Sequence, residues 1–364
     1  MWQVRASDKT SRYYAQTRRA HAPDGWLVGK FAAAQRPPMP LITADDFRET
    51  LAKLRQRGLP FLLSKLRPDA LARTRSAFDD PTLRAANWWQ VPAVRRRWNT
   101  RMTGQPDQPY EAYVAEKYLA GRRGLRLLSL GSGAASHELA FARLPQFAEV
   151  HCLDIAGRLL EQATAVARAE GLTNFRTEVA DVNALALPPA SCDVVLFHSA
   201  LHHFRDVDGI VARVRQALRP DGLLVINDFV GPARLQWTAA QLAETNRILR
   251  AVVPPRLRVR YLSRQLKNHV SGPGRWRMLL ADPSEAAESD RIVPALRQHF
   301  EPLEEAALGG NILTLVLKDI AHHFTNEADP EAQALLAELF RLEDAFLAQH
   351  PSDLLFGVYR PRPT

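Results

Sequence analysis

Cysteine is scarce in this 364-residue chain, which contains only two. Cys152 and Cys192 lie in short apolar segments, so we interpret them as small buried side chains and not as a disulfide or metal site. Any apolar run near the roughly 18 residues that span a membrane is also missing. Residues 1–5 lack the apolar stretch of a secretory signal. We therefore expect a cytoplasmic protein without a membrane span.

The charge balance is basic, with 48 Lys and Arg against 39 Asp and Glu. Such a balance suits nucleic acid, an acidic small molecule or solubility alone. The arginines gather in short separate groups, such as Arg95–Arg97 and Arg256–Arg260, and not in one stripe interleaved with aromatic residues. Nucleic-acid binding is therefore kept as a minority hypothesis.

The chain does contain a short apolar segment that ends in a glycine turn, within Leu125–Ser136. The leucines of this segment suit a strand buried on both faces. Gly131 and Gly133 allow the chain to turn tightly and to approach a ligand. A helix is predicted after the turn, and its amino end would offer free N–H groups and a positive dipole. Its apolar face would be Leu139, Ala140, Phe141 and Leu144.

Asp154 lies near the end of a second predicted strand, 150–155, where its carboxylate could accept both hydrogen bonds of a ribose diol. A Gly-x-Gly turn alone is a weak signal, but the following segments agree with it. Three further strands are predicted over residues 175–180, 192–197 and 222–226. Two helices are predicted over residues 159–168 and 210–218. This alternation predicts a doubly wound, parallel α/β sheet that binds ligands at the carboxyl ends of its strands.

Polar residues also follow the third and fourth predicted strands. Asp181, with neighbouring backbone groups, could meet an adenine edge. In the segment 198–204, His198 and His202 are spaced i, i+4, so in a helix both would face the same side. A neutral His202 could then act as a general base near pH 7, with His198 the weaker candidate. The alternative for each is a hydrogen-bonded packing role.

Together these motifs resemble the class I S-adenosylmethionine-dependent methyltransferases over about residues 125–230. The resemblance implies a Rossmann-like methyltransferase fold, with a mostly parallel seven-stranded sheet, and S-adenosyl-L-methionine as cofactor. No metal is expected. It places the cofactor contacts in the glycine turn and at the strand ends, namely at Leu130, Gly131, Ser132, Gly133, Glu138, Asp154, Ile155, Asp181, Val182 and His198.

Two residues depart from the family pattern. Ser129 stands two positions before the first glycine, where the family often has an acid that helps to hold the methionine ammonium. Glu138 is the nearest replacement, although a Glu on a helix face is more often only solvated. Ala135 replaces the third glycine of the usual motif, which should narrow the turn without closing it.

Outside this core we expect a helical N-terminal cap or lid over 1–120, and a methyltransferase domain over 121–364 whose insertion around 232–285 forms the acceptor pocket. A helix near Pro92 would dock an apolar face that includes Trp98 and could bring an arginine to the methionine carboxylate; the alternative is a surface helix with solvated arginines. Other expected elements are helices over 44–83, 237–252, 284–300 and 332–347, an irregular stretch over 255–282, a β-prone or buried run over 311–317 and a last strand over 354–359.

The function expected from these features is methyl transfer to a small or medium metabolite of bacterial secondary metabolism, with the acceptor atom (O, N or C) and the oligomeric state open. One alternative is an NAD-dependent oxidoreductase, but Ser136 stands where Gly-x-Gly-x-x-Gly has its last glycine. The other is a catalytically silent nucleic-acid-binding module on the same scaffold. Asp154 and Asp181 argue against it, because a silent module needs no carboxylates at the strand ends.

Overall fold

The computed structural model describes residues 40–47, 50, 87–281 and 283–363, all of which belong to one unit, residues 39–364. The predicted N-terminal region 1–39 and most of the helical segment 44–83 lie outside the described residues; residues 44–47 are helical. Within the described part of the chain, no helix is long and apolar enough to cross a membrane.

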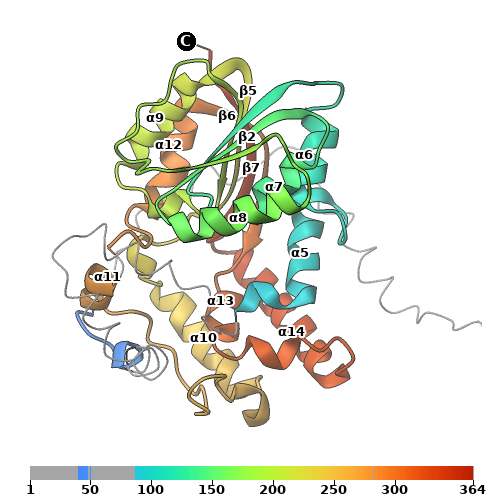
Figure 1. The fold of residues 1–364 in the computed structure, drawn as a ribbon. Coiled ribbons are helices and arrows are strands. Elements are labelled where there is room, and N and C mark those ends of the chain that lie inside the picture. Colours follow the sequence, from blue (N-terminus) through green and yellow to red (C-terminus); the bar gives the residue numbers. More distant parts are fainter. Residues whose placement is uncertain (1–39, 48–49, 51–86, 282, 364) are drawn as a thin grey trace, which may run out of the picture. The chain divides into compact units, whose positions relative to one another are not determined.

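Seven strands form one sheet in the order β3-β2-β1-β4-β5-β7-β6 (Figure 1). Neighbours from β3 to β5 pair in parallel, whereas β7 is antiparallel to both β5 and β6. The predicted mostly parallel, doubly wound sheet is confirmed. The strands are β1 (Leu125–Leu130), β2 (Phe147–Asp154), β3 (Phe175–Val179), β4 (Cys192–His198), β5 (Leu218–Phe229), β6 (Phe300–Gly309) and β7 (Leu354–Pro361).

The chain order reverses between β1 and β4. From β1 the chain proceeds outward to β2 and β3, then returns to lie on the other side of β1 as β4. In open α/β sheets such a switch point leaves a crevice at the carboxyl ends of the strands, where ligands bind. The glycine turn after β1 and the histidine segment after β4 both lie at this switch point.

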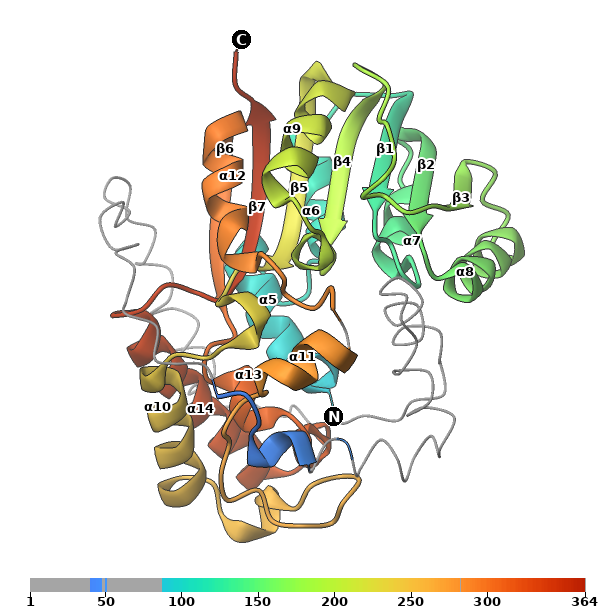
Figure 2. The same cartoon turned by 90° about the vertical axis from the view of Figure 1, so that its left-hand side faces the viewer.

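Helices cover both faces of the sheet. Helices α9 (Val207–Ala217) and α12 (Ile292–His299) lie on one face, and α6 (Tyr110–Tyr118), α7 (Ser136–Ala142) and α8 (Gly157–Ala169) on the other (Figure 2). Burial from both sides explains why residues 192–197 of β4 are all buried.

A second group of helices lies beyond the carboxyl ends of the parallel strands (Figure 2). These are α5 (Pro92–Thr103), α10 (Ala239–Ala251), α13 (Leu313–Leu317) and α14 (Pro330–Leu347), which share one apolar cluster; α11 (Arg275–Ala281) lies at the same end. Short 3₁₀ turns complete the described elements: η1 (Trp88–Gln90), η2 (Leu201–His203), η3 (Ala233–Leu235), η4 (Pro255–Arg258), η5 (Ser289–Arg291) and η6 (Ala321–Phe324).

Helix α5 begins at Pro92 as predicted and buries Val91 and Val94. Its arginines face acidic residues of the C-terminal part. Arg97 lies 2.6 Å from Asp344 of α14, which also pairs with Arg101. These ion pairs join α5 to α14, a contact that the sequence analysis did not foresee.

The C-terminal part differs from the sequence predictions at four elements. The β-prone run 311–317 contains helix α13, although its burial was foreseen. Strand β6 was not predicted, and α11 lies in the stretch expected to be irregular. The helix expected over 284–300 starts at Ile292, so Pro294 lies in its first turn.

The insertion is attached to the sheet by a buried hydrogen bond. Thr238 and Gln241 form a capping box at the start of α10. The Gln241 amide also donates to Asp353, just before β7, over 2.6 Å. Burial raises the pKa of Asp353 to about 7, although Gln241 partly offsets it.

Asp353 should make stability depend on pH. The pKa of Asp353 is higher in the folded protein than its value of about 3.9 in the unfolded chain. The side chain therefore contributes fully to the free energy of unfolding below about pH 3.9, and this contribution is lost as the pH rises toward 7. Asp353→Asn cannot ionise, so its unfolding free energy should rise relative to wild type by roughly 2 kcal/mol between about pH 5 and about pH 8. Urea denaturation at both pH values measures this. The exposed Asp221→Asn is the control, and a difference independent of pH would contradict the account.

Candidate active site

The turn after β1 lies open on one side and is tightly packed on the other. Gly131 and Gly133 have φ of 78° and 53°, in the left-handed region that favours glycine. A Cβ added to Gly131 would lie 2.9 Å from the Ala200 Cβ, so the turn packs against the segment after β4. A Cβ on Gly133 would meet nothing within 4 Å. Ala135 also adopts a left-handed φ, of 52°, and starts α7 without a glycine.

Asp154 is the last residue of β2. Its side chain connects the glycine turn after β1 to the turn that follows β2. One carboxylate oxygen accepts a hydrogen bond from the Gly133 amide, and the other accepts one from the Ala156 amide; each bond is 2.7 Å long. The side chain is only half-buried, and each carboxylate oxygen has two acceptor positions. Asp154 therefore holds both turns and can still accept two further hydrogen bonds. This geometry fits a ribose diol.

The residues after β3 form a local turn. Asp181 accepts hydrogen bonds from the Asn183 amide at 3.0 Å and from the Asn183 side chain at 3.1 Å. Val182 is buried in the core, as is Leu130, whereas Ile155 and Ser132 are half-buried. The side chains of Val182 and Leu130 therefore serve packing, and only their backbones could face a ligand.

Glu138 is not the solvated helix residue that the sequence analysis considered. Its side chain is 2% exposed and accepts a hydrogen bond from the Ser129 hydroxyl over 2.6 Å. Burial raises the pKa of Glu138, with Ser129 partly offsetting this effect. Ser129, which stands where the family often has an acid, is therefore in contact with Glu138, the replacement that the sequence analysis considered.

His198 belongs to a cluster that sequence reasoning missed. Its Nδ1 lies 3.1 Å from the Tyr110 hydroxyl, and its ring stacks on His137 with centroids 3.5 Å apart. His137 in turn is hydrogen-bonded to the buried Glu111. Burial, together with the nearby His137, lowers the pKa of His198 well below its ordinary value, so this imidazole is neutral at neutral pH.

His202 lies in η2 and not in a helix continuous with His198, so the expectation that the two share one helix face was wrong. The Nδ1 of His202 is hydrogen-bonded to the buried Asp228 at the end of β5. Burial alone would raise the pKa of Asp228, but His202 and the Ala200 and Leu201 amides outweigh it and lower that pKa. Asp228 thus fixes the ring and leaves Nε2 on the opposite side.

The insertion reaches the histidines through Glu285. One Glu285 oxygen lies 3.9 Å from His202 Nε2 and the other 3.8 Å from His203 Nδ1. Donor atoms of these three residues lie within 4.8 Å of one another, the one such group found in the described part of the chain. Their residue types could bind a divalent cation such as zinc.

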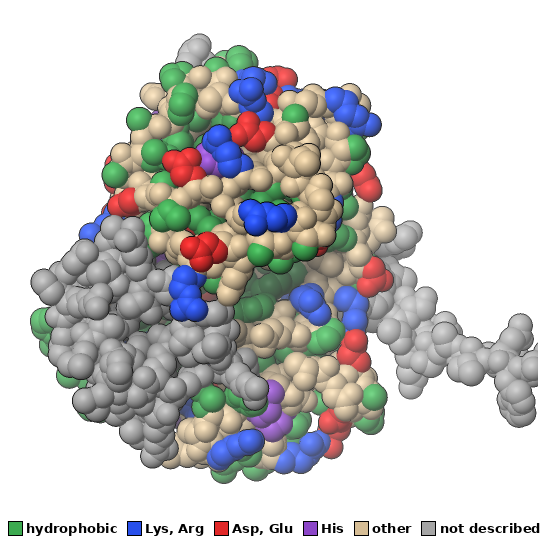
Figure 3. Space-filling model, viewed as in Figure 1, with side chains coloured by type: hydrophobic (Ala, Val, Ile, Leu, Met, Phe, Trp, Pro, Cys, Tyr) green, Lys and Arg blue, Asp and Glu red, His purple; other side chains and the backbone are tan. Residues whose placement is uncertain are grey.

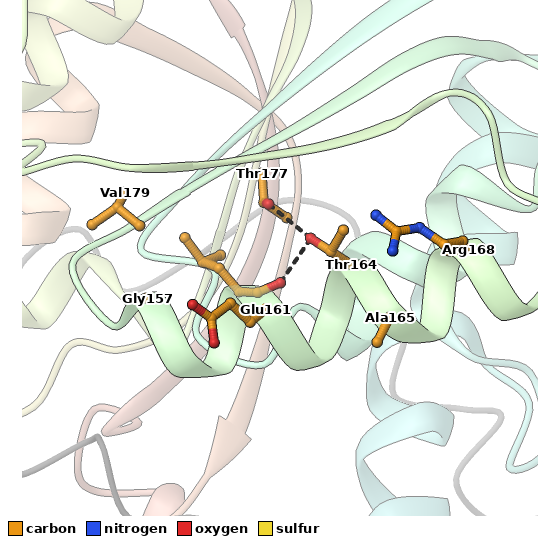
Figure 4. Close-up of a pocket in the computed structure, with 8 residues that line it drawn as sticks. Gly157, Glu161, Thr164, Ala165, Arg168, Thr177 and Val179 are labelled. Atoms are coloured by element: carbon orange, nitrogen blue, oxygen red, sulfur yellow. Dashed lines mark hydrogen bonds between the residues drawn. The ribbon is translucent and has the colours of Figure 1, made fainter.

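A separate shallow pocket lies between α8 and β3 (Figure 4). Thr164 and Thr177 meet across its floor with their hydroxyls 2.8 Å apart, and Arg168 and Glu161 stand at its rim. Neither the glycine turn nor the histidines line it. It is therefore distinct from the crevice at the switch point.

Residues 122–284 match a family model described as a methyltransferase domain. The chain carries a class I S-adenosylmethionine-dependent methyltransferase domain. Its cofactor is S-adenosyl-L-methionine, and the open glycine turn and the free acceptor positions of Asp154 fit the adenosine part of that molecule.

Several curated proteins similar to this methyltransferase domain are named as methyltransferases. An uncharacterized methyltransferase, YcgJ, of Bacillus subtilis is 32% identical over 107 residues, 29% of this chain and 42% of that protein. The 27-O-demethylrifamycin SV methyltransferase of Amycolatopsis mediterranei is 32% identical, covering 36% and 50%. A malonyl-[acyl-carrier protein] O-methyltransferase of Methylovorus sp. is 28% identical, covering 48% and 55%. The chain spans about half the length of these relatives.

Replacing Asp154 by Asn should weaken cofactor binding. The loss of a charge-assisted hydrogen bond costs about 1.5 to 3 kcal/mol, roughly ten- to a hundredfold in affinity. Isothermal titration with S-adenosylhomocysteine measures this effect, and Asp181→Ala should weaken binding in the same assay. Asp221→Asn, with a side chain that is 73% exposed, is the matched control. Wild-type affinity in a folded Asp154→Asn variant would remove Asp154 from the cofactor site.

Proposed function

We propose that this protein transfers the methyl group of S-adenosyl-L-methionine to a small or medium metabolite. The observation that carries the proposal is the half-buried Asp154 carboxylate, which joins the glycine turn to the end of β2 within a methyltransferase domain. Residues that bind adenosine at this position are what a cofactor-dependent transferase needs. The function that we propose for the whole protein rests on this assignment of Asp154 to the cofactor site.

The cofactor supplies an already activated methyl group, so the chain must bind it, align an acceptor and exclude water. In the proposal Asp154 accepts the ribose hydroxyls, and Asp181 with the Val182 backbone meets the adenine edge. The turn from Leu130 to Gly133 approaches the cofactor through its backbone. Ile155 and His198 border the same crevice.

A proton must leave the acceptor when it is a hydroxyl group. We assign this step to His202 Nε2, because Asp228 accepts a hydrogen bond from Nδ1–H and so leaves Nε2 as the proton acceptor. Asp228 is a positioning residue that also stabilises the imidazolium once it forms. His198 is the weaker candidate, since its Nδ1 is engaged by Tyr110.

Oxygen is the acceptor atom that the relatives favour. The printed names of the rifamycin and malonyl-[acyl-carrier protein] methyltransferases each specify an oxygen position, and the first of these enzymes acts by name on a rifamycin. We extend to this chain an oxygen acceptor and a role in secondary metabolism. The insertion over 232–285 would build the acceptor pocket, with Glu285 at the border of that pocket beside His202.

The alternatives have less support. The relatives carry methyltransferase names, which do not favour a nicotinamide enzyme. On the face shown in Figure 3, the described Lys and Arg side chains stand singly among acidic and neutral ones and form no continuous stripe. A nucleic-acid footprint would need such a stripe. A cytoplasmic location remains part of the proposal.

Isothermal titration with three probes tests the proposal. S-adenosylhomocysteine should bind, whereas NADH and a short duplex DNA should not. A transfer assay would then follow the labelled methyl group of S-adenosylmethionine onto a panel of phenols, alcohols, carboxylic acids and amines. Binding of NADH or DNA with no binding of S-adenosylhomocysteine would overturn the proposal.

His202→Gln should slow methyl transfer to whichever hydroxyl compound of the panel is methylated. Loss of a general base lowers kcat by roughly 10²- to 10⁴-fold, and the loss should shrink at high pH, where hydroxide replaces the base. Affinity for S-adenosylhomocysteine should stay unchanged. His203→Gln is the matched control, and activity measured after chelation separates a base from a metal ligand. Wild-type turnover in His202→Gln would return His202 to a packing role.

A further inference from the structure

Three side chains from two separate parts of the chain converge just beyond the end of β4. His202 and His203 belong to η2, whereas Glu285 belongs to the insertion. One Glu285 oxygen lies 3.9 Å from His202 Nε2, and the other lies 3.8 Å from His203 Nδ1. Both separations exceed the roughly 3.2 Å limit of an N–H···O hydrogen bond, so neither pair of atoms is hydrogen-bonded. One donor atom from each of the three residues lies within 4.8 Å of the other two.

These distances suit ligands of a shared metal ion. Bonds of about 2.0 to 2.2 Å from zinc to imidazole and carboxylate place neighbouring donor atoms of a tetrahedral site about 3.4 Å apart. Glu285 is partly exposed, so rotation of its side chain can bring its oxygens to that spacing. The Ser284 hydroxyl, from the same loop, lies 3.5 Å from His203 Nδ1. Two histidines and one glutamate form a ligand set that zinc uses, with water in the fourth position.

His202 is already oriented as a metal ligand. Its other ring nitrogen, Nδ1, is hydrogen-bonded to Asp228. A carboxylate behind a histidine in this way fixes the ring and makes the opposite nitrogen a better ligand. Asp228 is itself held by the Ala200 and Leu201 amides, over 2.9 and 2.7 Å. The charges also balance, because the carboxylates of Asp228 and Glu285 together offset the two positive charges of a divalent ion.

The loop that carries Glu285 is fixed on both sides of this residue. The Arg234 amide donates a hydrogen bond to the Ala286 carbonyl over 2.6 Å, and the Arg234 guanidinium donates to the Pro283 carbonyl. Ala286 is also fully buried. The third ligand is therefore presented by an anchored backbone, which lowers the entropy that metal binding must overcome.

We propose that His202, His203 and Glu285 bind one divalent transition-metal ion such as Zn²⁺, and that this ion fastens the insertion to the end of β4. The binding of the ion is independent of the proposed function. Its effect on catalysis rests on that function, since the ion occupies the Nε2 lone pair with which His202 accepts a proton. Bound zinc is then a reversible inhibitor. The sequence analysis expected no metal because Glu285 lies far from the histidines in the chain.

Isothermal titration of the full chain with ZnCl₂ tests the site. Wild type should bind one equivalent, and His203→Gln and Glu285→Gln should each weaken binding by at least about tenfold, since loss of a ligand should cost no less than loss of its outer hydrogen-bond partner. The matched control is His323→Gln. Its ring lies 3.9 Å from that of His322, but no third ligand converges on this pair among the described residues. The control should bind zinc as wild type does.

Thermal unfolding shows whether the variants are folded. All four proteins should have similar Tm values without metal, and zinc should raise the Tm of wild type and His323→Gln more than that of the other two. A wild type that binds no zinc, or equal zinc affinity in all four proteins, would overturn the inference.

The effect on catalysis is measured with whichever hydroxyl compound is methylated. Zinc should inhibit wild type, a chelator should restore its activity, and His203→Gln should resist inhibition. Full activity of the zinc-loaded protein, or activity that needs zinc, would overturn the effect assigned to His202. If zinc binds as described but S-adenosylhomocysteine does not, the proposed function fails and the metal site stands.

Discussion

Burial of the central strands on both faces is the constraint on which the remaining structure depends. Strands β1 and β4 are buried along most of their length, so most polar side chains gather where the strands of the sheet end. Asp154, Asp228 and the segment from His198 follow this rule. Ser129 is a buried polar residue inside β1, and its hydroxyl donates a hydrogen bond to Glu138. The site thus lies at the strand ends because the buried strands of the sheet exclude most polar side chains.

Asp154 and Asp228, at this end of the sheet, each orient neighbouring groups. Asp154 holds the amides of two turns, and Asp228 holds the imidazole of His202 together with the amides of Ala200 and Leu201. Such groups are fixed before any ligand arrives, which lowers the entropy that binding must overcome. The crevice is therefore organised mainly by carboxylate-to-backbone contacts that the fold itself provides.

Local sequence signals were sufficient for the sheet core and the glycine turn. The strands from β1 to β5, the position of Asp154 and the start of α5 at Pro92 all come from apolar runs and from glycine or proline chemistry. Strand β6 was not predicted from the sequence, because residues 300–309 carry several glutamates and form an edge strand, so that no apolar run marks them.

Distant partners account for the other failures. Helix α13 has a β-prone composition, but the buried Glu343 accepts amides at its start and Lys267 donates to carbonyls at its end. Those residues lie far away in the chain. The Tyr110, Glu111 and His137 contacts similarly join α6, α7 and β4, and no spacing within any one element could have revealed them.

The central claim, that the crevice at the carboxyl ends of β1, β2 and β4 binds S-adenosyl-L-methionine, is tested most directly by a crystal structure of the complex with S-adenosylhomocysteine. The account predicts ribose hydroxyls on Asp154, adenine beside Asp181 and Val182, and the amino-acid end beside the glycine turn. Adenosine bound in the pocket between α8 and β3, or density absent from the crevice at saturating ligand, would contradict it.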